Sequence, residues 1–241
     1  MSGVPWHLIP ALQPAPAEGV YFRRRSARWF QRLPLGRNAL YGASWFDIEG
    51  DHQAGAMCHV VVEIDANRRM YVVECWHRRT DIDSAVQAMF QIQEGLHIVQ
   101  LWADRAPQRS ITYGPARWFL EPRQYEAGIA ARIHHRRTRV NERRPQSQHF
   151  RIAISPLEEA MSIHQAARSL QADLSTGALM LPPERVGQYG AMETELLMWP
   201  ATPSASRVAA LGLITAAREL IQPGGRHATP TSRAPAGWMA Q

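Results

Sequence analysis

Residues 58–64 read CHVVVEI, and residues 70–76 read MYVVECW. Both runs are mostly apolar and rich in β-branched residues, which is typical of buried strands. The segment Asp65-Ala66-Asn67-Arg68 between them has the composition of a turn. This part of the sequence therefore predicts two strands that are joined as a hairpin.

The elements on either side of the hairpin extend it into a larger sheet. Residues 39–46 (ALYGASWF) predict a strand before the hairpin, and residues 97–103 (HIVQLWA) predict a fourth strand after it. Between them, apolar residues recur at helical spacing after Asp81, which can cap the start of a helix. The order strand-strand-strand-helix-strand predicts an α/β fold, with a mixed sheet of about five strands flanked by helices.

The remainder of the chain predicts more helices and two arms. We expect a helix after Ser155, with Pro156 at its first position and Gly177 at its end. A short strand is predicted at 179–182, with helical stretches at 193–199 and 207–221. Composition divides the chain into a flexible arm at 1–20, a folded domain at 21–222 and a disordered tail at 223–241.

The basic residues exclude two kinds of chemistry. All 27 of them are arginine, so the chain offers neither the lysine of a P-loop ATPase nor the amine of a Schiff-base enzyme. The net charge of +6 and the isoelectric point near 10.0 suit a polyanionic partner. Codon bias in a GC-rich genome explains the exclusive use of arginine equally well.

The sequence gives little support for a membrane or secreted protein, for disulfide bonds or for a zinc site. No apolar run approaches the ~18 residues of a membrane helix, and the first residues lack the basic region of a signal peptide. We therefore expect a cytoplasmic protein with no membrane partner. Cys58 and Cys75 form no CxxC motif, and we expect them to be buried thiols rather than disulfide or zinc ligands.

Arginines gather in two places that could contact nucleic acid. The first is the stretch 132–144, where Arg136, Arg137, Arg143 and Arg144 are candidates for binding DNA phosphates. A solvated helix face or a mobile loop is the alternative interpretation. The second place holds Arg23 and Arg24, which could bind nucleic acid or pair with a partner protein.

The order of these pieces resembles a known family. The similar pieces are Tyr41-Gly42-Ala43-Ser44, the hairpin within 60–76, Leu101-Trp102-Ala103-Asp104, and the segments 177–182, 195–200 and 208–214. Together they resemble the C-terminal nuclease domain of phage terminase large subunits, over roughly residues 18–221. The resemblance implies a ribonuclease-H-like fold and a place in viral DNA packaging, without the family's ATPase domain.

The resemblance also implies metal-dependent cleavage of duplex DNA by clustered carboxylates. Two Mg²⁺ or Mn²⁺ ions would be held by acids from the first strand, the end of the fourth strand and the start of the last helix. In this chain the first position is Trp45, with Asp47 two residues on, and the second is Asp104. The third falls on 204–209, which hold no acid. A degraded site is therefore predicted, with Asp104 and Asp47 as catalytic candidates.

Each of these ligand assignments has an alternative interpretation in which the residue does not bind metal. Asp104 can simply be a polar residue that ends a strand. Asp47, Glu49 and Asp51 can form a relocated metal cluster, with Asp51 as a further ligand, or a solvated loop. We expect His59, and likewise His52, to be a core or surface histidine rather than a ligand.

Three functions follow from these expectations. The first is a terminase-like nuclease-domain protein of a phage or prophage, in the host cytoplasm, that binds duplex DNA and cleaves it weakly or not at all. The alternative is an inactive module that docks on a packaging motor ATPase or a portal protein through its aromatic N-terminal segment. The third is a working nuclease with a rearranged single-metal site. Mg²⁺ or Mn²⁺ is the expected cofactor of an active protein, and none is expected otherwise.

Overall fold

The computed structural model describes residues 22, 30, 39–47, 55–95, 114–182, 188–201 and 205–221. The arms predicted at 1–20 and 223–241, and the strand predicted at 97–103, lie outside these residues. The strands are β1 (Ala39–Trp45), β2 (Gly55–Ile64), β3 (Met70–Thr80), β4 (Arg117–Leu120), β5 (Ile154–Pro156) and β6 (Leu179–Met180). The longer helices are α1 (Ile82–Gln93), α4 (Ala130–Asn141), α5 (Ile163–Thr176), α6 (Gln188–Met198) and α7 (Ser206–Ala216). Shorter helical segments are α3 (Pro122–Gln124), the π-helical η2 (Tyr125–Ile129), η3 (Gln146–Gln148) and η4 (Ala217–Leu220).

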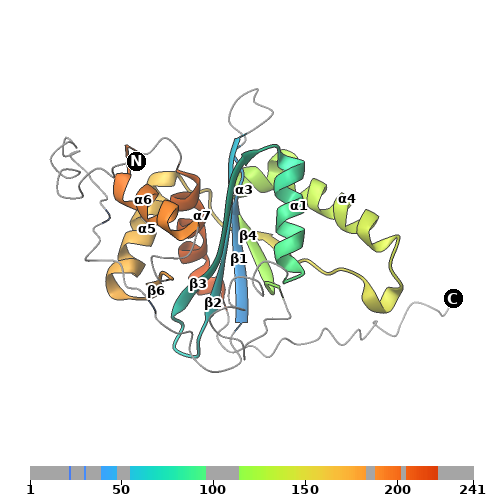
Figure 1. The fold of residues 1–241 in the computed structure, drawn as a ribbon, viewed down its shortest axis with the longest axis horizontal. Helices are drawn as coiled ribbons and strands as arrows, with labels where there is room; N and C mark the ends of the chain where they lie inside the picture. Colours follow the sequence, from blue (N-terminus) through green and yellow to red (C-terminus); the bar gives the residue numbers. More distant parts are fainter. Residues whose placement is uncertain are drawn as a thin grey trace.

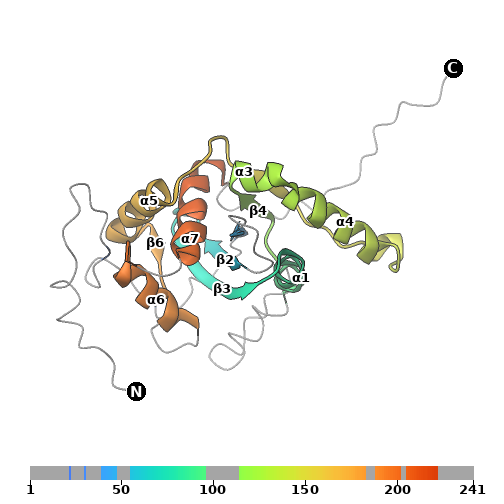
Figure 2. The same cartoon turned by 90° about the horizontal axis from the view of Figure 1, so that it is seen from above.

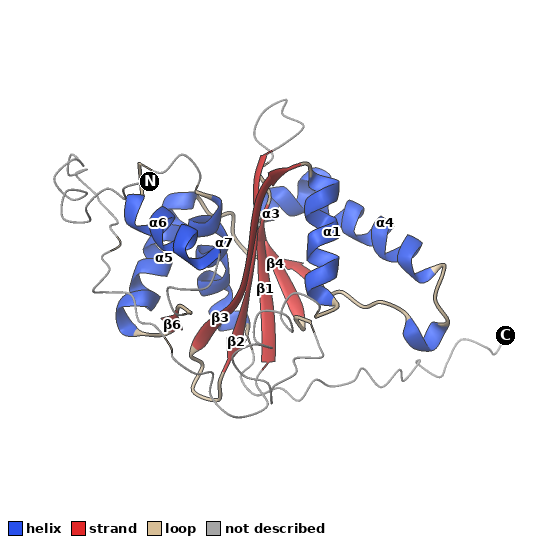
Figure 3. Ribbon diagram, in the orientation of Figure 1, coloured by secondary structure: helices blue, strands red, loops and turns tan. Residues whose placement is uncertain are grey.

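The described strands form one mixed sheet of six strands in the order β5-β4-β1-β2-β3-β6. β2 runs antiparallel to both β1 and β3, whereas β4 lies parallel to β1, β5 parallel to β4, and β6 parallel to β3. The sheet separates two groups of helices (Figure 3). An antiparallel meander that continues into parallel strands beyond its first strand is the ribonuclease-H-like arrangement, so the predicted fold class is confirmed.

Helices cover both faces of the sheet, with α5, α6 and α7 on one side and α1 and α4 on the other (Figure 1). Both faces of the sheet carry apolar side chains that must be buried, because successive valines of β2 point to opposite sides. Val60 and Val62 belong to the core beneath α7, and Val61 belongs to the core beneath α1. All three are fully buried, which is why the run looks uniformly apolar in the sequence.

The predicted hairpin is confirmed, and both of its strands are longer than expected. Ile64 lies opposite Met70, so the turn falls where the sequence places it. The Asp65 carboxylate fixes this turn by accepting hydrogen bonds from the backbone N–H groups of Asn67 and Arg69, each at 2.9 Å. This is the self-bonding turn that an aspartate favours.

Two predicted helix boundaries are also confirmed. Asp81 precedes α1, and its carboxylate accepts a hydrogen bond from the backbone N–H of Ser84 at 2.7 Å. Gly177 follows α5 with a φ of 75°, a left-handed conformation that glycine adopts without strain. Cys58 and Cys75 are buried free thiols, as expected.

The helix predicted to start at Pro156 is wrong. Pro156 ends β5, which lies at an edge of the sheet, where a missing backbone N–H costs no ladder bond. The helix α5 begins at Ile163 instead. Ser162 and Gln165 form a reciprocal capping box there, and that pairing fixes the start of the helix.

In the part of the chain that the structure describes, no helix has both the length and the apolar composition that crossing a membrane requires.

Candidate functional site

Most of the arginine-rich stretch lies in the helix α4, which extends away from the sheet and past α1 (Figure 2). The chain reaches α4 from β4 through α3 and the π-helical turn η2. Gly128 in η2 has a φ of 92°, which is not helical and marks a kink before α4. Ala130 and Ile133 are its buried residues. With so little apolar contact of its own, α4 presents most of its surface to solvent.

Two arginines of the stretch contact α1, Arg132 near its start and Arg136 in its last turn. Arg132 donates to the Asp83 carboxylate at 2.9 Å, and both side chains are largely exposed. The half-buried Arg136 places its guanidinium over the ring of Phe90, 5.5 Å from the ring centroid. The guanidinium of Arg136, a predicted phosphate ligand, is therefore engaged in a cation–π contact within the protein.

Arg144 contacts the end of α1. It donates to the carboxylate of Glu94, the residue that follows α1, at 2.7 Å. Its guanidinium also lies 5.8 Å from the ring centroid of Phe150. Phe150 is buried and stacks on Phe90, with centroids 4.5 Å apart. Arg144, another predicted phosphate ligand, thus lies between a carboxylate and an aromatic ring.

Three arginines of the stretch face solvent instead. Arg139 and Arg143 are exposed and Arg137 is half-buried. Among the described residues, none of the three forms an ion pair or hydrogen bond through its side chain. Arg137 and Arg139 lie on α4, and Arg143 lies in the turn that follows it. The predicted candidates Arg23 and Arg24 lie outside the described residues.

Asp47, the predicted acid near the end of β1, has a local structural role. Its carboxylate accepts a hydrogen bond from the backbone N–H of Ala56 at 3.3 Å. Its own backbone N–H points at the Met57 sulfur, 3.2 Å away. Asp47 therefore joins the end of β1 to the start of β2 by hydrogen bonds. The other two predicted ligands, Asp51 and Asp104, lie outside the described residues, as do Glu49 and His52.

The start of α7 carries a cation paired with a buried acid. Arg207 donates from its guanidinium to Glu195 of α6 at 2.7 Å, and its backbone N–H donates to the same carboxylate at 2.8 Å. Burial raises the pKa of Glu195, and the attraction of Arg207 acts against that rise. Trp45 lies opposite Cys58 on the face that α7 covers. Neither the Trp45 position nor the start of α7 supplies a free carboxylate.

Glu121 is a buried acid that the sequence did not single out. It directly follows β4, which pairs with β1 from Tyr41 to Ser44. One carboxylate oxygen accepts from Gln124 N at 3.1 Å, and the other from Arg123 Nε at 3.0 Å. Part of the signal was present, because a proline such as Pro122 is typical of the first position of a helix. Both oxygens of Glu121 are therefore already engaged.

The described residues do not fit a divalent metal ion. Hard cations take several oxygen ligands at one point, yet in the described ranges no group of three or more His, Cys, Asp and Glu side chains could hold one. Asp47, Glu121 and Glu195 are each bonded to groups of their own neighbourhood.

His59 is a core histidine, as expected. Its Nε2 lies 2.8 Å from the carbonyl oxygen of Ala85, which can only accept, so Nε2 carries the proton. Its Nδ1 then accepts from the hydroxyl of Ser44, also at 2.8 Å. Burial lowers the pKa of His59 to about 4, and the ring stacks on Trp76. A neutral imidazole with both nitrogens bonded and no solvent contact is a structural group.

Comparisons with known proteins give likenesses of structure only. No protein-family model matches the sequence, and no curated protein matches it significantly. The structure is similar to the large terminase nuclease from thermophilic phage G20c with bound magnesium, at 12% identity and a TM-score of 0.49, covering 84% of this chain and 98% of that one. It is also similar to the P22 large terminase nuclease domain, at 8% identity and a TM-score of 0.45, covering 85% and 92%. For the human cytomegalovirus terminase nuclease domain the values are 11%, 0.42, 75% and 82%.

Proposed function

We propose that this chain is a terminase-like nuclease-fold protein that binds duplex DNA through α4 and serves viral DNA packaging, with metal-dependent cleavage that is weak or lost. The observation that carries the proposal is the set of Arg137 and Arg139 on α4 and Arg143 just after it, which have no carboxylate partner among the described residues. The ribonuclease-H-like strand order and the family resemblance of the sequence supply the context.

Duplex DNA is the partner whose chemistry best matches this helix. Guanidinium groups bind phosphate oxygens through charge-assisted hydrogen bonds, and each neutralised phosphate releases counterions. Because α4 protrudes and makes few apolar contacts, it can lie against the DNA backbone without a pocket shaped to hold the duplex. Arg139 lies in the last turn of α4 and Arg143 is four residues on, just after the helix, and that short separation in the chain allows both to contact one strand of the backbone.

Weak or absent cleavage is supported by what stands at the positions where the family resemblance expects acids. The first strand carries Trp45, and Asp47 is bonded to the Ala56 backbone. The start of the last helix carries Arg207, whose cation is paired with Glu195. The described fourth strand is followed by Glu121, whose two oxygens are bonded to Arg123 and Gln124. Asp104 stays a proposed ligand, and one carboxylate without bonded neighbours does not hold two divalent ions.

A binding titration at several salt concentrations tests the DNA proposal. We compare the wild-type chain with Arg137→Ala/Arg139→Ala/Arg143→Ala, using a labelled duplex of random sequence. The matched control is Arg69→Ala/Arg117→Ala/Arg168→Ala, which removes the same charge from exposed arginines outside α4. We expect the α4 variant to reduce the slope of log affinity against log salt by about 2–3. Equal losses in the two variants would contradict a site on α4.

A plasmid nicking assay with Mn²⁺ tests the cleavage part of the proposal. We expect no nicking above a metal-free control for the wild-type chain, and no effect of Asp104→Ala on that background. Nicking that Asp104→Ala abolishes would instead support a working nuclease with a rearranged site. The assay needs no knowledge of the natural DNA sequence.

The alternative, a module that docks on a motor ATPase or portal, receives less support. The backbone N–H of Phe30 donates to the Leu181 carbonyl oxygen at 3.0 Å, and its ring meets Tyr71 edge to face at 5.5 Å. Phe22 packs against the core beneath α7. These aromatic residues therefore belong to the domain's own packing. Co-purification with an ATPase, in the absence of any DNA binding, would favour the alternative.

A further inference from the structure

We propose that Asp83 and Glu94 of the α1 region compete with DNA phosphate for Arg132 and Arg144, and so set the salt concentration at which α4 binds DNA. This inference rests on the proposed DNA binding and adds its regulation. It follows from the way the two carboxylates occupy the same guanidinium groups that a phosphate would use. Neither acid contributes to the core of the fold.

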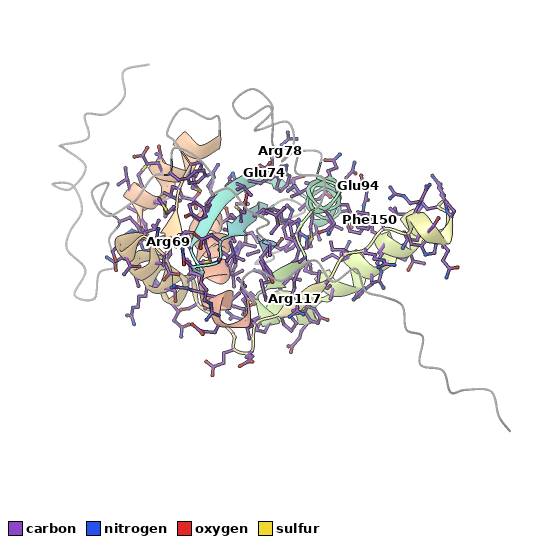
Figure 4. The ribbon with its side chains drawn as sticks, turned by 90° about the horizontal axis from the view of Figure 1, so that it is seen from below. Arg69, Glu74, Arg78, Glu94, Arg117 and Phe150 are labelled. Carbon is purple, nitrogen blue, oxygen red and sulfur yellow. The ribbon has the colours of Figure 1, made fainter. Side chains whose placement is uncertain are left out.

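The geometry of Arg144 is that of an occupied anion site. Phe150 lies under the guanidinium, and Glu94 bonds to one of its N–H edges at 2.7 Å. Figure 4 shows Glu94 and Phe150 as neighbours beside the end of α1. Because Phe150 is buried and stacked on Phe90, it keeps the guanidinium in place when the carboxylate leaves. A phosphate oxygen then meets a preorganised donor edge, since carboxylate and phosphate accept from arginine in the same way.

Arg132 belongs to the same surface as the free arginines. Arg132, Arg136 and Arg139 follow one another at spacings of four and three residues, which places them in one stripe along α4, and Arg143 lies two residues past the end of the helix. A strand of DNA backbone that contacts Arg139 and Arg143 therefore continues toward Arg132. At that point it meets the Asp83 carboxylate, 2.9 Å from the Arg132 guanidinium.

Both ion pairs are weak enough to be displaced. The side chains of Arg132 and Asp83 are 51% and 74% exposed, and those of Arg144 and Glu94 are 37% and 34% exposed. An exposed ion pair of this kind lowers the affinity of a competing anion by at most about fivefold. Two such pairs together permit a change of about tenfold, and DNA that bridges the whole stripe can overcome it.

The test compares two charge-matched double variants in the same duplex titration. Asp83→Asn/Glu94→Gln removes the competing carboxylates and keeps the side-chain shapes. Glu126→Gln/Glu142→Gln removes the same charge from exposed acids in η2 before α4 and directly after α4, which form no ion pair in the described structure. We expect about tenfold tighter binding and a salt slope steeper by about two for the first variant. Less than about twofold is expected for the second, because solvent screens those charges.

A second pair of measurements isolates Arg144. Arg144→Ala should weaken binding in the Glu94→Gln background and leave binding nearly unchanged in the wild-type background, where Glu94 already occupies the group. Thermal unfolding of each variant confirms that α4 remains in place. Equal effects of Arg144→Ala in both backgrounds would overturn the competition.

The outcomes separate this inference from the proposed function. If the wild-type chain binds DNA through α4 and both double variants behave alike, only the competition is wrong. If DNA binding appears only in Asp83→Asn/Glu94→Gln, the competition is supported in its strongest form. If neither the wild-type chain nor that variant binds, both proposals are overturned.

Discussion

Arg207 of α7 donates twice to the carboxylate of Glu195 on α6, once from its guanidinium at 2.7 Å and once from its backbone N–H at 2.8 Å. The backbone N–H of Val208 donates to the same carboxylate at 3.2 Å. Glu195 therefore satisfies two of the N–H groups that the start of a helix leaves without an intrahelical partner. It also joins α6 to α7 across a nearly buried contact, with side chains that are 4% and 12% exposed.

Removing Glu195 should destabilise the protein strongly. Glu195→Ala leaves the Arg207 cation buried without a partner and uncaps α7, so we expect the free energy of unfolding to fall by about 3–5 kcal/mol. Urea unfolding followed by circular dichroism measures the loss. Glu219→Ala, which removes an exposed acid from η4, serves as the control and should change it by less than about 0.5 kcal/mol. A loss below about 1 kcal/mol for Glu195→Ala would contradict the role given to this pair.

Acid should destabilise the fold through two histidines. Burial lowers the folded-state pKa of His59 and of His77 from 6.5 to about 4. Between these values the unfolded chain binds protons that the folded chain does not, so stability is full above pH 6.5 and is lost as the pH falls toward 4. For the fully buried His59 alone, the loss is about 3 kcal/mol. Urea unfolding at intervals between pH 8 and pH 4 measures it, and His77→Asn should make the fall shallower.

Glu74 should act in the opposite direction. Burial raises its folded-state pKa from 4.5 to about 7. Between these values the folded chain holds a proton that the unfolded chain releases, so this contribution to stability is full below pH 4.5 and is lost as the pH rises through 7. One carboxylate oxygen accepts from the Cys75 backbone N–H at 2.9 Å, and the other has no partner among the described residues. Figure 4 places Glu74 on β3.

Glu74→Gln tests this opposition directly. The amide oxygen can keep the bond to the Cys75 N–H while the titrating proton is removed. We expect the variant to be more stable than the wild-type chain at pH 8, where the wild type holds a buried charge. We also expect a steeper loss on acidification from pH 6.5 to 4.5, because the histidines then act alone. Parallel profiles of the two proteins over this interval would show that Glu74 does not titrate as the structure implies.

The sequence predicts those elements whose signals are local. The hairpin of β2 and β3, the Asp81 cap and the Gly177 cap each depend on residues close together in the chain, and each is confirmed. β4 escaped prediction because it is only four residues long and gains its stability from parallel pairing with the distant β1. Parallel partners of this kind leave no hairpin signal between them.

The same distinction governs the candidate site. The stretch 132–144 marks a cationic surface in the sequence, but not which arginines are available. Arg136 and Arg144 are drawn toward Phe90 and Glu94, residues about fifty positions earlier in the chain. No local pattern reports such contacts. Glu121 could have been found as a helix cap, whereas its place beside the end of β1 depends on the sheet order.

Gly42 should be intolerant of even one added methyl group. A Cβ at this position of β1 would lie 2.3 Å from the Trp118 ring of β4. Trp118 is fully buried, and its indole N–H donates to the Gln93 side-chain oxygen at 2.6 Å, so the ring cannot yield without losing that bond. We expect Gly42→Ala to lower the free energy of unfolding by about 1–3 kcal/mol or more.

A double-mutant cycle assigns this loss to the contact itself. Trp118→Leu opens space at the ring and is destabilising on its own. In that background, Gly42→Ala should cost much less, because its methyl group enters a cavity rather than a packed ring. Urea unfolding of the four proteins gives the coupling energy, which we expect to exceed about 1 kcal/mol. Additive losses would mean that Gly42 is required for its backbone conformation rather than for the close approach of β4 to β1.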